Sequence, residues 1–210
     1  MPPTFFKISG HSIISGGWGD YGDILQQGMG AHSKEVDGRM QLERTGPFIP
    51  PITFPGLRGF VLTSEARSML ESSEFTGYSF KPVDKKLIVE LHWEDWDLNA
   101  SEPAIYPETG EPEDYILGQP HSSEAASALG DLWEVVVPKT VSVLPKTVSV
   151  LRQRRIVESY KELSIDSSTW DGADIFASND VGYTFFTERA QNWFFGHFGE
   201  YVDFQEFPSV

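Results

Sequence analysis

The chain has 210 residues, of which 40% are hydrophobic, 13% aromatic and 22% charged, a composition typical of a globular protein. It contains no cysteine, which excludes disulfide scaffolds, thiolate metal sites and thiol nucleophiles. The 31 acidic and 16 basic side chains give a formal net charge of −15, which argues against a nucleic-acid-binding surface because such a surface needs clustered lysine and arginine.

The length and the hydropathy pattern predict one domain in the cytoplasm. We expect a single domain over residues 1–210, with sub-units at 1–57, 58–137 and 138–210. Met1 to Phe6 carry no positive charge, no long apolar run follows them, and no stretch approaches the roughly eighteen apolar residues of a membrane span. We therefore expect a cytoplasmic protein without a cofactor and without a membrane or nucleic-acid partner.

The first 57 residues are rich in glycine and proline, which interrupt helices and long strands. We expect short strands at Thr4–Ile8 and Ile13–Ile14, and an extended segment over Pro47–Pro55 that crosses the surface. Apolar residues such as Phe48 and Phe54 indicate an arm that packs on a core.

Residues 58–137 begin with a strand–helix–strand pattern. An apolar run ends at Thr63 and Ser64, which are N-cap candidates, and Glu65 follows in the first turn. Ala66, Met69 and Leu70 form the apolar stripe of the predicted helix. We expect Gly77 to end this helix and Tyr78–Val83 to form the next strand.

The same pattern recurs from Tyr183 onward. Thr187 ends an apolar run, Ala190, Trp193 and Phe194 form a helical stripe, and Gly196 and Gly199 are expected to break it before a strand over Tyr201–Phe207. The two units lie 124 residues apart, which indicates an internal duplication or one local solution used twice. The predicted fold class is α+β, with a mixed or antiparallel sheet and a few short helices.

Between the units we expect a strand at Leu87–Leu91, an acidic loop over Glu94–Asp114 and a short helix at Ser123–Leu129. The heptapeptide PKTVSVL then occurs twice in tandem, at Pro138–Leu144 and Pro145–Leu151. Its alternating valines favour β structure, which we expect as a lengthened hairpin or flap. A helix is predicted from Arg152 to Leu163.

The segment Leu87–Pro138 holds twelve carboxylates and no lysine or arginine. Such a density of like charge needs compensation by solvent, a basic partner or a metal ion, and all three remain open. The twelve acidic residues are Glu90, Glu94, Asp95, Asp97, Glu102, Glu108, Glu111, Glu113, Asp114, Glu124, Asp131 and Glu134.

Within this segment, the sequence HWEDWD at residues 92–97 interleaves two tryptophans with three carboxylates. Aromatic residues anchor protein interfaces and exposed carboxylates steer a cationic partner. The predicted partner-binding residues are Trp93, Glu94, Asp95, Trp96, Asp97, Glu108, Glu111, Glu113 and Asp114.

Known catalytic and metal-binding motifs are absent or incomplete. The GWGDYG sequence at residues 17–22 fits GxGxxG but lacks the flanking strand and helix, and the HWE at residues 92–94 lacks the cysteines of zinc deaminases. Asp95-x-Asp97-x-Asn99 starts like a calcium loop, but lacks its glycine and its final glutamate. His121 and Glu124 share one turn as a possible acid–base or ligand pair, although a helix cap at Ser122 or Ser123 explains that stretch as well.

Three C-terminal sequences carry a family resemblance. With DGADIF at residues 171–176, FFTERAQNW at residues 185–193 and VDFQEF at residues 202–207, the chain resembles immunity proteins of bacterial polymorphic toxin systems, especially the double-CxxCG family. The resemblance implies a non-catalytic protein that binds and neutralises a toxin of the same cell, and the acidic excess suits a basic toxin. The paired CxxCG motifs are absent here, so no structural metal is implied.

Two other classes of function stay open at the sequence level. One is a metal-dependent hydrolase that uses His92, Glu94, Asp95, Asp97 and His121, whose oxygen-rich ligand set favours magnesium, calcium or manganese. The other is a structural or scaffolding protein, which differs from an immunity protein only in having no toxin partner.

Overall fold

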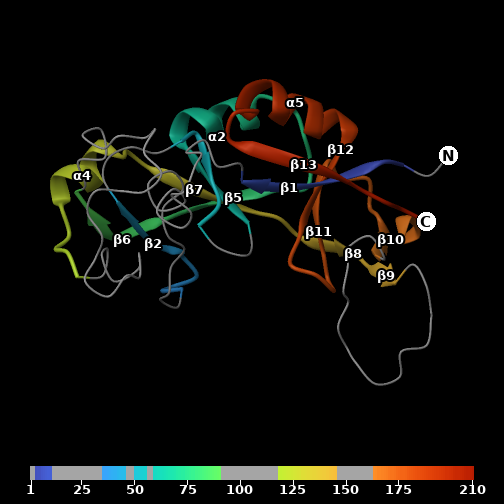
Figure 1. The fold of residues 1–210 in the computed structure, drawn as a ribbon, viewed down its shortest axis with the longest axis horizontal. Coiled ribbons are helices and arrows are strands. Elements are labelled where there is room, and N and C mark those ends of the chain that lie inside the picture. The colour runs from blue at the N-terminus through green and yellow to red at the C-terminus, as the bar shows by residue number, and fades with distance from the viewer. Residues whose placement is uncertain (1–2, 11–34, 46–49, 56–58, 91–117, 146–162) are drawn as a thin grey trace, which may run out of the picture.

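The computed structural model describes residues 3–10, 35–45, 50–55, 59–90, 118–145 and 163–210 (Figure 1). The described part is an α+β fold with four sheets, mostly antiparallel, as the sequence predicts. Its strands are β1 (Phe5–Gly10), β2 (Gln41–Thr45), β3 (Ile52–Thr53), β4 (Phe60–Thr63), β5 (Ser79–Pro82), β6 (Asp84–Val89), β7 (Leu132–Val136), β8 (Lys139–Val141), β9 (Val143–Pro145), β10 (Leu163–Ile165), β11 (Ile175–Ser178), β12 (Thr184–Thr187) and β13 (Val202–Phe207). Its helices are α2 (Ser64–Glu71), α4 (Ser123–Ala128), α5 (Glu188–Phe198) and the 3₁₀ turn η3 (Ser167–Thr169).

Two larger sheets form the middle of the molecule. One has the strand order β3-β4-β7-β5 and the other has the order β13-β1-β12-β11-β8. Helices α2 and α5 lie together along the top in Figure 1, while the small sheets β2-β6 and β10-β9 lie below, at opposite ends. Each larger sheet is therefore covered on one face by a helix and on the other by a separate small sheet.

The two predicted strand–helix–strand units are both present. Thr63 and Thr187 are the N-caps, with nearly identical backbone angles (φ −67°, ψ 163° and φ −67°, ψ 160°). Each threonine hydroxyl oxygen accepts a hydrogen bond from the N–H three residues on, that of Ala66 at 3.3 Å and that of Ala190 at 3.4 Å. Capping by the same residue in the same geometry explains why the two helices begin at equivalent positions.

The predicted helix ends are partly wrong. Helix α2 ends at Glu71 and not at Gly77, because the hydroxyls of Ser72 and Ser73 bond the carbonyls of Met69 and Leu70 in the last turn. Helix α5 continues through Gly196 and ends at the second predicted break, with Gly199 as its C-cap.

The repeat extends beyond the helices to the sheets around them. In the first unit, β4 pairs antiparallel with β3 on one side and with the central strand β7 on the other, and β5 pairs with the far side of β7. In the second unit, β12 pairs in the same way with β11 and the central strand β1, and β13 pairs with the far side of β1. Thr63 lies opposite Leu132 as Thr187 lies opposite Phe5. Agreement in topology and register favours a duplication over one local solution used twice.

The two units have exchanged their central strands. In each half of the chain, the common elements follow in the same order: a central strand, a hairpin of two strands, a helix and an edge strand. Strand β1 belongs to the first half of the chain but completes the second unit, whereas β7 belongs to the second half but completes the first unit. Each sheet therefore depends on a strand from the other half.

A shared apolar core joins the units beneath α2 and α5. Its buried side chains include Phe60, Leu70, Phe186, Phe194 and Phe198, all 2% exposed or less. The ring of Phe60 lies 6.2 Å from that of Phe186 and 6.0 Å from that of Phe194, which connects the first sheet directly to the second unit. Burial of each such side chain contributes about 1.5–3 kcal/mol, so this core holds the halves together.

The remaining sequence predictions have mixed outcomes. Helix α4 lies within the predicted range Ser123–Leu129, whereas β6 begins three residues before the predicted strand Leu87–Leu91 and ends at Val89. The placement of Pro47–Pro55 on the surface is wrong for Ile52 and Thr53, which are buried in β3, and the helix predicted up to Leu163 is wrong at that residue, which begins β10.

The first PKTVSVL copy forms β structure, but its two strands pair with β11 and β10 and not with each other. Ile13–Ile14, the GWGDYG sequence, residues 152–162 and the second heptapeptide beyond Pro145 lie outside the described residues.

Candidate functional site

The predicted partner-binding residues lie in a segment that is outside the described residues. This holds for all nine, namely Trp93, Glu94, Asp95, Trp96, Asp97, Glu108, Glu111, Glu113 and Asp114. The structure describes the residues on either side of this segment, at the end of β6 and just before α4.

These two ends are held against each other by hydrogen bonds. The N–H of Ile88 donates to Nδ1 of His121 at 3.1 Å, and the N–H of Ser122 donates to the Ile88 carbonyl at 2.7 Å. The Ser122 hydroxyl oxygen then caps α4 by accepting from the N–H of Ala125 at 3.1 Å. Ile88 itself is fully buried against Ala125 and neighbouring α4 residues. The described residues on the two sides of residues 91–117 are therefore bonded to each other.

This geometry gives His121 a structural role. Its Nδ1 accepts a hydrogen bond from the N–H of Ile88, so this atom cannot bind a metal ion or a substrate while that hydrogen bond is present. No group of three histidine or acidic side chains is placed to hold a metal ion within the described ranges. The other residues of the hydrolase hypothesis, His92, Glu94, Asp95 and Asp97, lie outside those ranges.

Four carboxylates of the acidic segment belong to the described part. Glu90, Glu124 and Asp131 are exposed, and Glu134 on β7 is half-buried. Burial raises the pKa of Glu134 above its ordinary value, against the attraction of Lys81 and with the repulsion of Glu35. One of its carboxylate oxygens, Oε2, is buried and has no hydrogen-bond partner.

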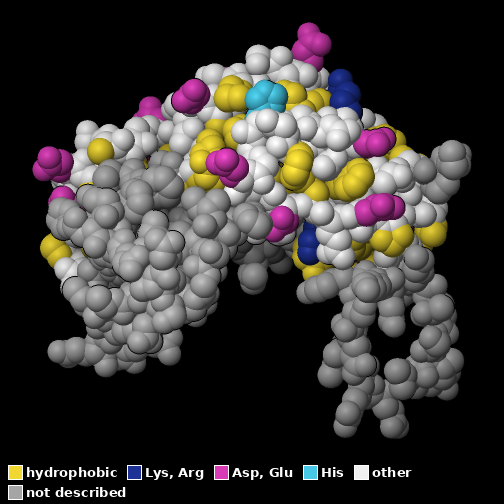
Figure 2. All heavy atoms as spheres, turned by 45° about the horizontal axis from the view of Figure 1, so that its top comes forward, with side chains coloured by type: hydrophobic (Ala, Val, Ile, Leu, Met, Phe, Trp, Pro, Cys, Tyr) yellow, Lys and Arg dark blue, Asp and Glu magenta, His cyan; other side chains and the backbone are white. Residues whose placement is uncertain are grey.

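Helix α5 presents aromatic side chains outside the core. Phe195 is 58% exposed, and His197 is exposed with its ring stacked 4.3 Å from that of the half-buried Trp193. The Trp193 ring also contacts Phe75, beyond the end of α2, at 5.7 Å. Figure 2 shows apolar side chains on this helical face with acidic ones around them and few basic ones. Trp193 and His197, four residues apart, lie on one flank of α5, whereas Phe195 lies on the other.

A buried aspartate fixes α5 to the first unit. Asp174, which is 7% exposed, accepts hydrogen bonds from Nε and Nη2 of Arg189 at 3.1 and 2.7 Å and from the Thr187 hydroxyl at 3.2 Å. It also accepts from the backbone N–H of Thr76, in the turn after α2, at 3.1 Å. Burial alone raises the pKa of Asp174, but these hydrogen bonds and the Arg189 charge outweigh it and lower the pKa below its ordinary value.

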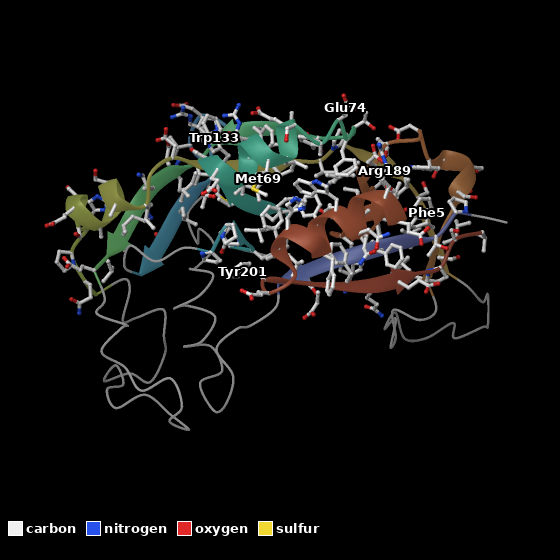
Figure 3. The ribbon with its side chains drawn as sticks, turned by 90° about the horizontal axis from the view of Figure 1, so that it is seen from above. Phe5, Met69, Glu74, Trp133, Arg189 and Tyr201 are labelled. Atoms are coloured by element: carbon white, nitrogen blue, oxygen red, sulfur yellow. The ribbon has the colours of Figure 1, made fainter. Side chains whose placement is uncertain are left out.

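Figure 3 shows how this contact lies relative to the helices. Arg189 projects at the start of α5, on the side toward Glu74, whereas Tyr201 lies beyond the opposite end of the helix. The position of α5 relative to the turn after α2 is therefore set by a buried polar contact at one end of the helix.

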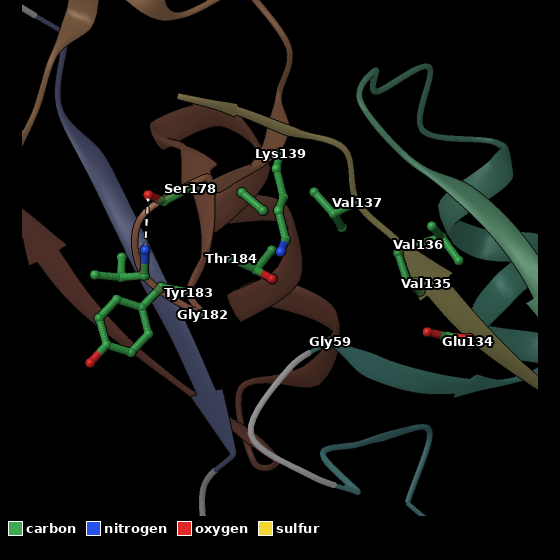
Figure 4. Close-up of a pocket in the computed structure, with 12 residues that line it drawn as sticks. Gly59, Glu134, Val135, Val136, Val137, Lys139, Ser178, Gly182, Tyr183 and Thr184 are labelled. Atoms are coloured by element: carbon green, nitrogen blue, oxygen red, sulfur yellow. Dashed lines mark hydrogen bonds between the residues drawn. The ribbon is translucent and has the colours of Figure 1, made fainter. Parts of the chain in front are cut away.

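Two hollows of about 140 and 230 Å³ lie where the two units meet, and they share Gly59 and residues 182–184 as walls. Figure 4 shows the smaller one, with Lys139 directed toward Thr184 and the backbone of Val135–Val137 along one side. The Ser178 hydroxyl oxygen in its wall accepts from the N–H groups of Asp180 and Val181, so it closes a turn.

The sequence did not predict the exposed side chains of α5. Trp193 was assigned to the apolar stripe, and Phe195 and His197 were given no role. A signal was present, because Phe195 falls on the side of the helix away from Ala190 and Phe194, where an amphipathic helix is ordinarily polar.

Comparison of the chain with protein-family models, with curated proteins and with solved structures found no match. Among the described helices, none is both long and apolar enough to cross a membrane.

Proposed function

We propose that this protein is a non-catalytic immunity protein that binds and neutralises a basic bacterial toxin. The observation that carries the proposal is the dense run of carboxylates in the sequence between β6 and α4, whose flanking residues Ile88, His121 and Ser122 are bonded to each other. Clustered carboxylates accelerate association with a cationic partner.

The C-terminal resemblance to toxin-immunity proteins supports the same proposal. The resemblance indicates that the partner is a toxin, whereas the negative charge of this chain indicates that the toxin's binding surface is positive. The residues that we propose as contacts are those of the loop, from Trp93 to Asp114, with Glu94, Asp95 and Asp97 as the steering charges.

The test begins with the partner. The tagged chain is expressed in its organism of origin, and proteins that bind at low salt and are released at moderate salt are identified by mass spectrometry. We expect a basic protein that arrests bacterial growth when expressed alone and no longer does so when this chain is co-expressed.

Variants then assign the effect to the loop. We expect the triple change Glu94→Gln, Asp95→Asn and Asp97→Asn to weaken binding and reduce the rescue of growth. The matched change Glu65→Gln, an exposed carboxylate in the first turn of α2, should leave both unchanged. A captured protein that is harmless, or growth that this chain does not restore, would show that the protein has another function.

A further inference from the structure

The duplication gives each larger sheet an equivalent edge strand. Strand β5 lies on the outer side of the central strand β7 in the first unit, as β13 lies on the outer side of β1 in the second. Within the described part of the chain, no further strand pairs with either edge. Half of the N–H and C=O groups of such a strand point away from its neighbour and can pair with another extended chain.

The edge of the first unit is blunted. Strand β5 has four residues, of which the last two are Lys81 and Pro82. Proline has no N–H to donate, and a lysine on an edge strand hinders pairing with further strands. The opposite edges of the two larger sheets are formed by β3 and β8, which have only two and three residues. Short length, lysine and proline therefore protect three of the four edges.

The edge of the second unit lacks these protective features. Strand β13 has six residues, none of them lysine or proline, and it pairs with β1 residue for residue. The side chains of Asp203, Gln205 and Glu206 are exposed, and that of Phe204 is half-buried. Figure 3 shows β13 on the outer side of β1, beginning near Tyr201. In the described part of the two larger sheets, β13 is therefore the one long and regular edge strand.

Charge opposes a second copy of this chain at that edge. In the antiparallel register that would pair all six residues of two copies, Asp203 of each copy lies opposite Glu206 of the other. Like charges directly opposite each other are destabilising, and each chain carries a formal net charge of −15. The acidic side chains therefore disfavour self-association, whereas they favour a strand that carries lysine or arginine.

We propose that the outer edge of β13 binds an extended basic segment of a protein partner, which adds a sixth strand to the five-stranded sheet. The backbone groups of β13 supply the hydrogen bonds, and Asp203 and Glu206 select a basic sequence. The class of partner rests on the proposed immunity function, whereas the location of the site rests on the difference between β13 and β5.

The experiment uses the full-length chain and a phage-displayed library of random peptides. Peptides selected on the immobilised wild-type chain are synthesised, and their affinities for two variants are measured. The edge variant, Asp203→Lys with Glu206→Lys, reverses the charge of β13. The control variant, Glu90→Lys with Asp131→Lys, changes the net charge by the same amount at exposed carboxylates outside β13.

We expect basic peptides, whose binding falls at least about tenfold in the edge variant and stays within about twofold of wild type in the control variant. Amide hydrogen exchange of the wild-type chain then tests the geometry. A bound strand should slow exchange at every second residue of β13, because only alternate N–H groups face the open edge. This measurement needs no variant, so it decides the question even if the edge variant is less stable.

Peptides that bind the edge variant as tightly as the wild type, or that leave the exchange of β13 unchanged, would overturn the proposal, as would a selection that yields no binding peptide. Exchange of β13 that slows as the concentration of the wild-type chain alone rises would also overturn it, because the edge would then bind a second copy. No toxin is used, so this result is independent of the growth-rescue test of the proposed function.

Discussion

The two units share a backbone interaction at the helix N-cap but differ in the side chain beside it. In the first unit, the N–H of Thr63 donates to the carbonyl of Pro51 at 3.1 Å, and in the second, the N–H of Thr187 donates to the carbonyl of Asp174 at 2.9 Å. The proline has no polar side chain to contribute. The Asp174 carboxylate, by contrast, binds Arg189, Thr187 and Thr76. Because Thr76 lies in the turn after α2, this carboxylate also bonds the second unit to the first. Interactions that define the unit are repeated, whereas those that join the units are not.

The largest expected effect is at the turn where the units touch. Gly77 has φ +92°, and a Cβ added there would overlap the carbonyl oxygen of Ile175 and the side chain of Ala173. We expect Gly77→Ala to lower the free energy of unfolding by about 3 kcal/mol, since backbone strain and steric overlap add. Chemical denaturation measures this loss.

Gly172→Ala is the control for that substitution. Gly172 has φ +90° but nothing within 4 Å of an added Cβ, so only the backbone term applies. We expect a loss of about 1 kcal/mol. Equal losses for the two variants would mean that the units do not touch closely at Gly77.

A smaller effect is expected from the carboxylate that joins the units. Asp174→Asn removes a buried charge that compensates Arg189, and we expect a loss of about 2 kcal/mol at neutral pH. Because the folded-state pKa of Asp174 lies below its ordinary value of 3.8, its stabilisation is present above that pH and disappears as the pH falls through the folded pKa. The difference between wild type and variant should therefore shrink in denaturation curves recorded below about pH 4.

Asp131→Asn, an exposed carboxylate at the start of β7, should change stability by less than about 0.5 kcal/mol. A pH-independent difference between wild type and Asp174→Asn would contradict the assigned ionisation.

The two N-caps give a direct comparison of the units. Thr63→Ala should cost about 1 kcal/mol, as for other capping threonines. Thr187→Ala should cost more, because the Thr187 hydroxyl also donates to Asp174 at 3.2 Å. Thermal denaturation of both variants, with and without Asp174→Ala, measures how much more Thr187→Ala costs than Thr63→Ala. This difference should vanish in the Asp174→Ala background, which has no side-chain acceptor, and a difference that persists there would assign it to another cause.

The smallest effect is expected at Glu134, whose pKa is shifted in the opposite direction from that of Asp174. Its folded-state pKa lies above the ordinary value of 4.5, so ionisation destabilises the fold as the pH rises through the folded pKa. We expect Glu134→Gln to stabilise the protein by about 0.5–1 kcal/mol at neutral pH and to have no effect well below pH 4.5. Chemical denaturation of the wild type and the variant at neutral pH and well below pH 4.5 checks this expectation. The matched control is Glu90→Gln, at an exposed carboxylate. Destabilisation at neutral pH would show that the carboxylate has a favourable partner.

Local sequence signals predicted the elements that depend on local chemistry. Threonine and serine caps at Thr63, Thr187 and Ser122 located three helix starts, and alternation located β5 and β13. Helix ends were less predictable, because serine hydroxyls in α2 replaced the expected glycine stop and Gly196 was tolerated within α5. The exchange of β1 and β7 depends on contacts between distant residues, which periodicity does not encode. For the candidate site, the sequence indicated an acidic, aromatic binding surface, but the exposure of Phe195 required the packed helix.

The exchanged strands have a consequence for biosynthesis. Strand β1 is synthesised long before β12 and β13, yet Phe5 pairs with Phe207, and β4 is likewise synthesised well before its partner β7. The second sheet therefore cannot close until β12 and β13 have been synthesised, and such distant pairing is slow to form. During that interval β1 has both edges open, so its two phenylalanines and Ile8 are exposed to other nascent chains and to chaperones.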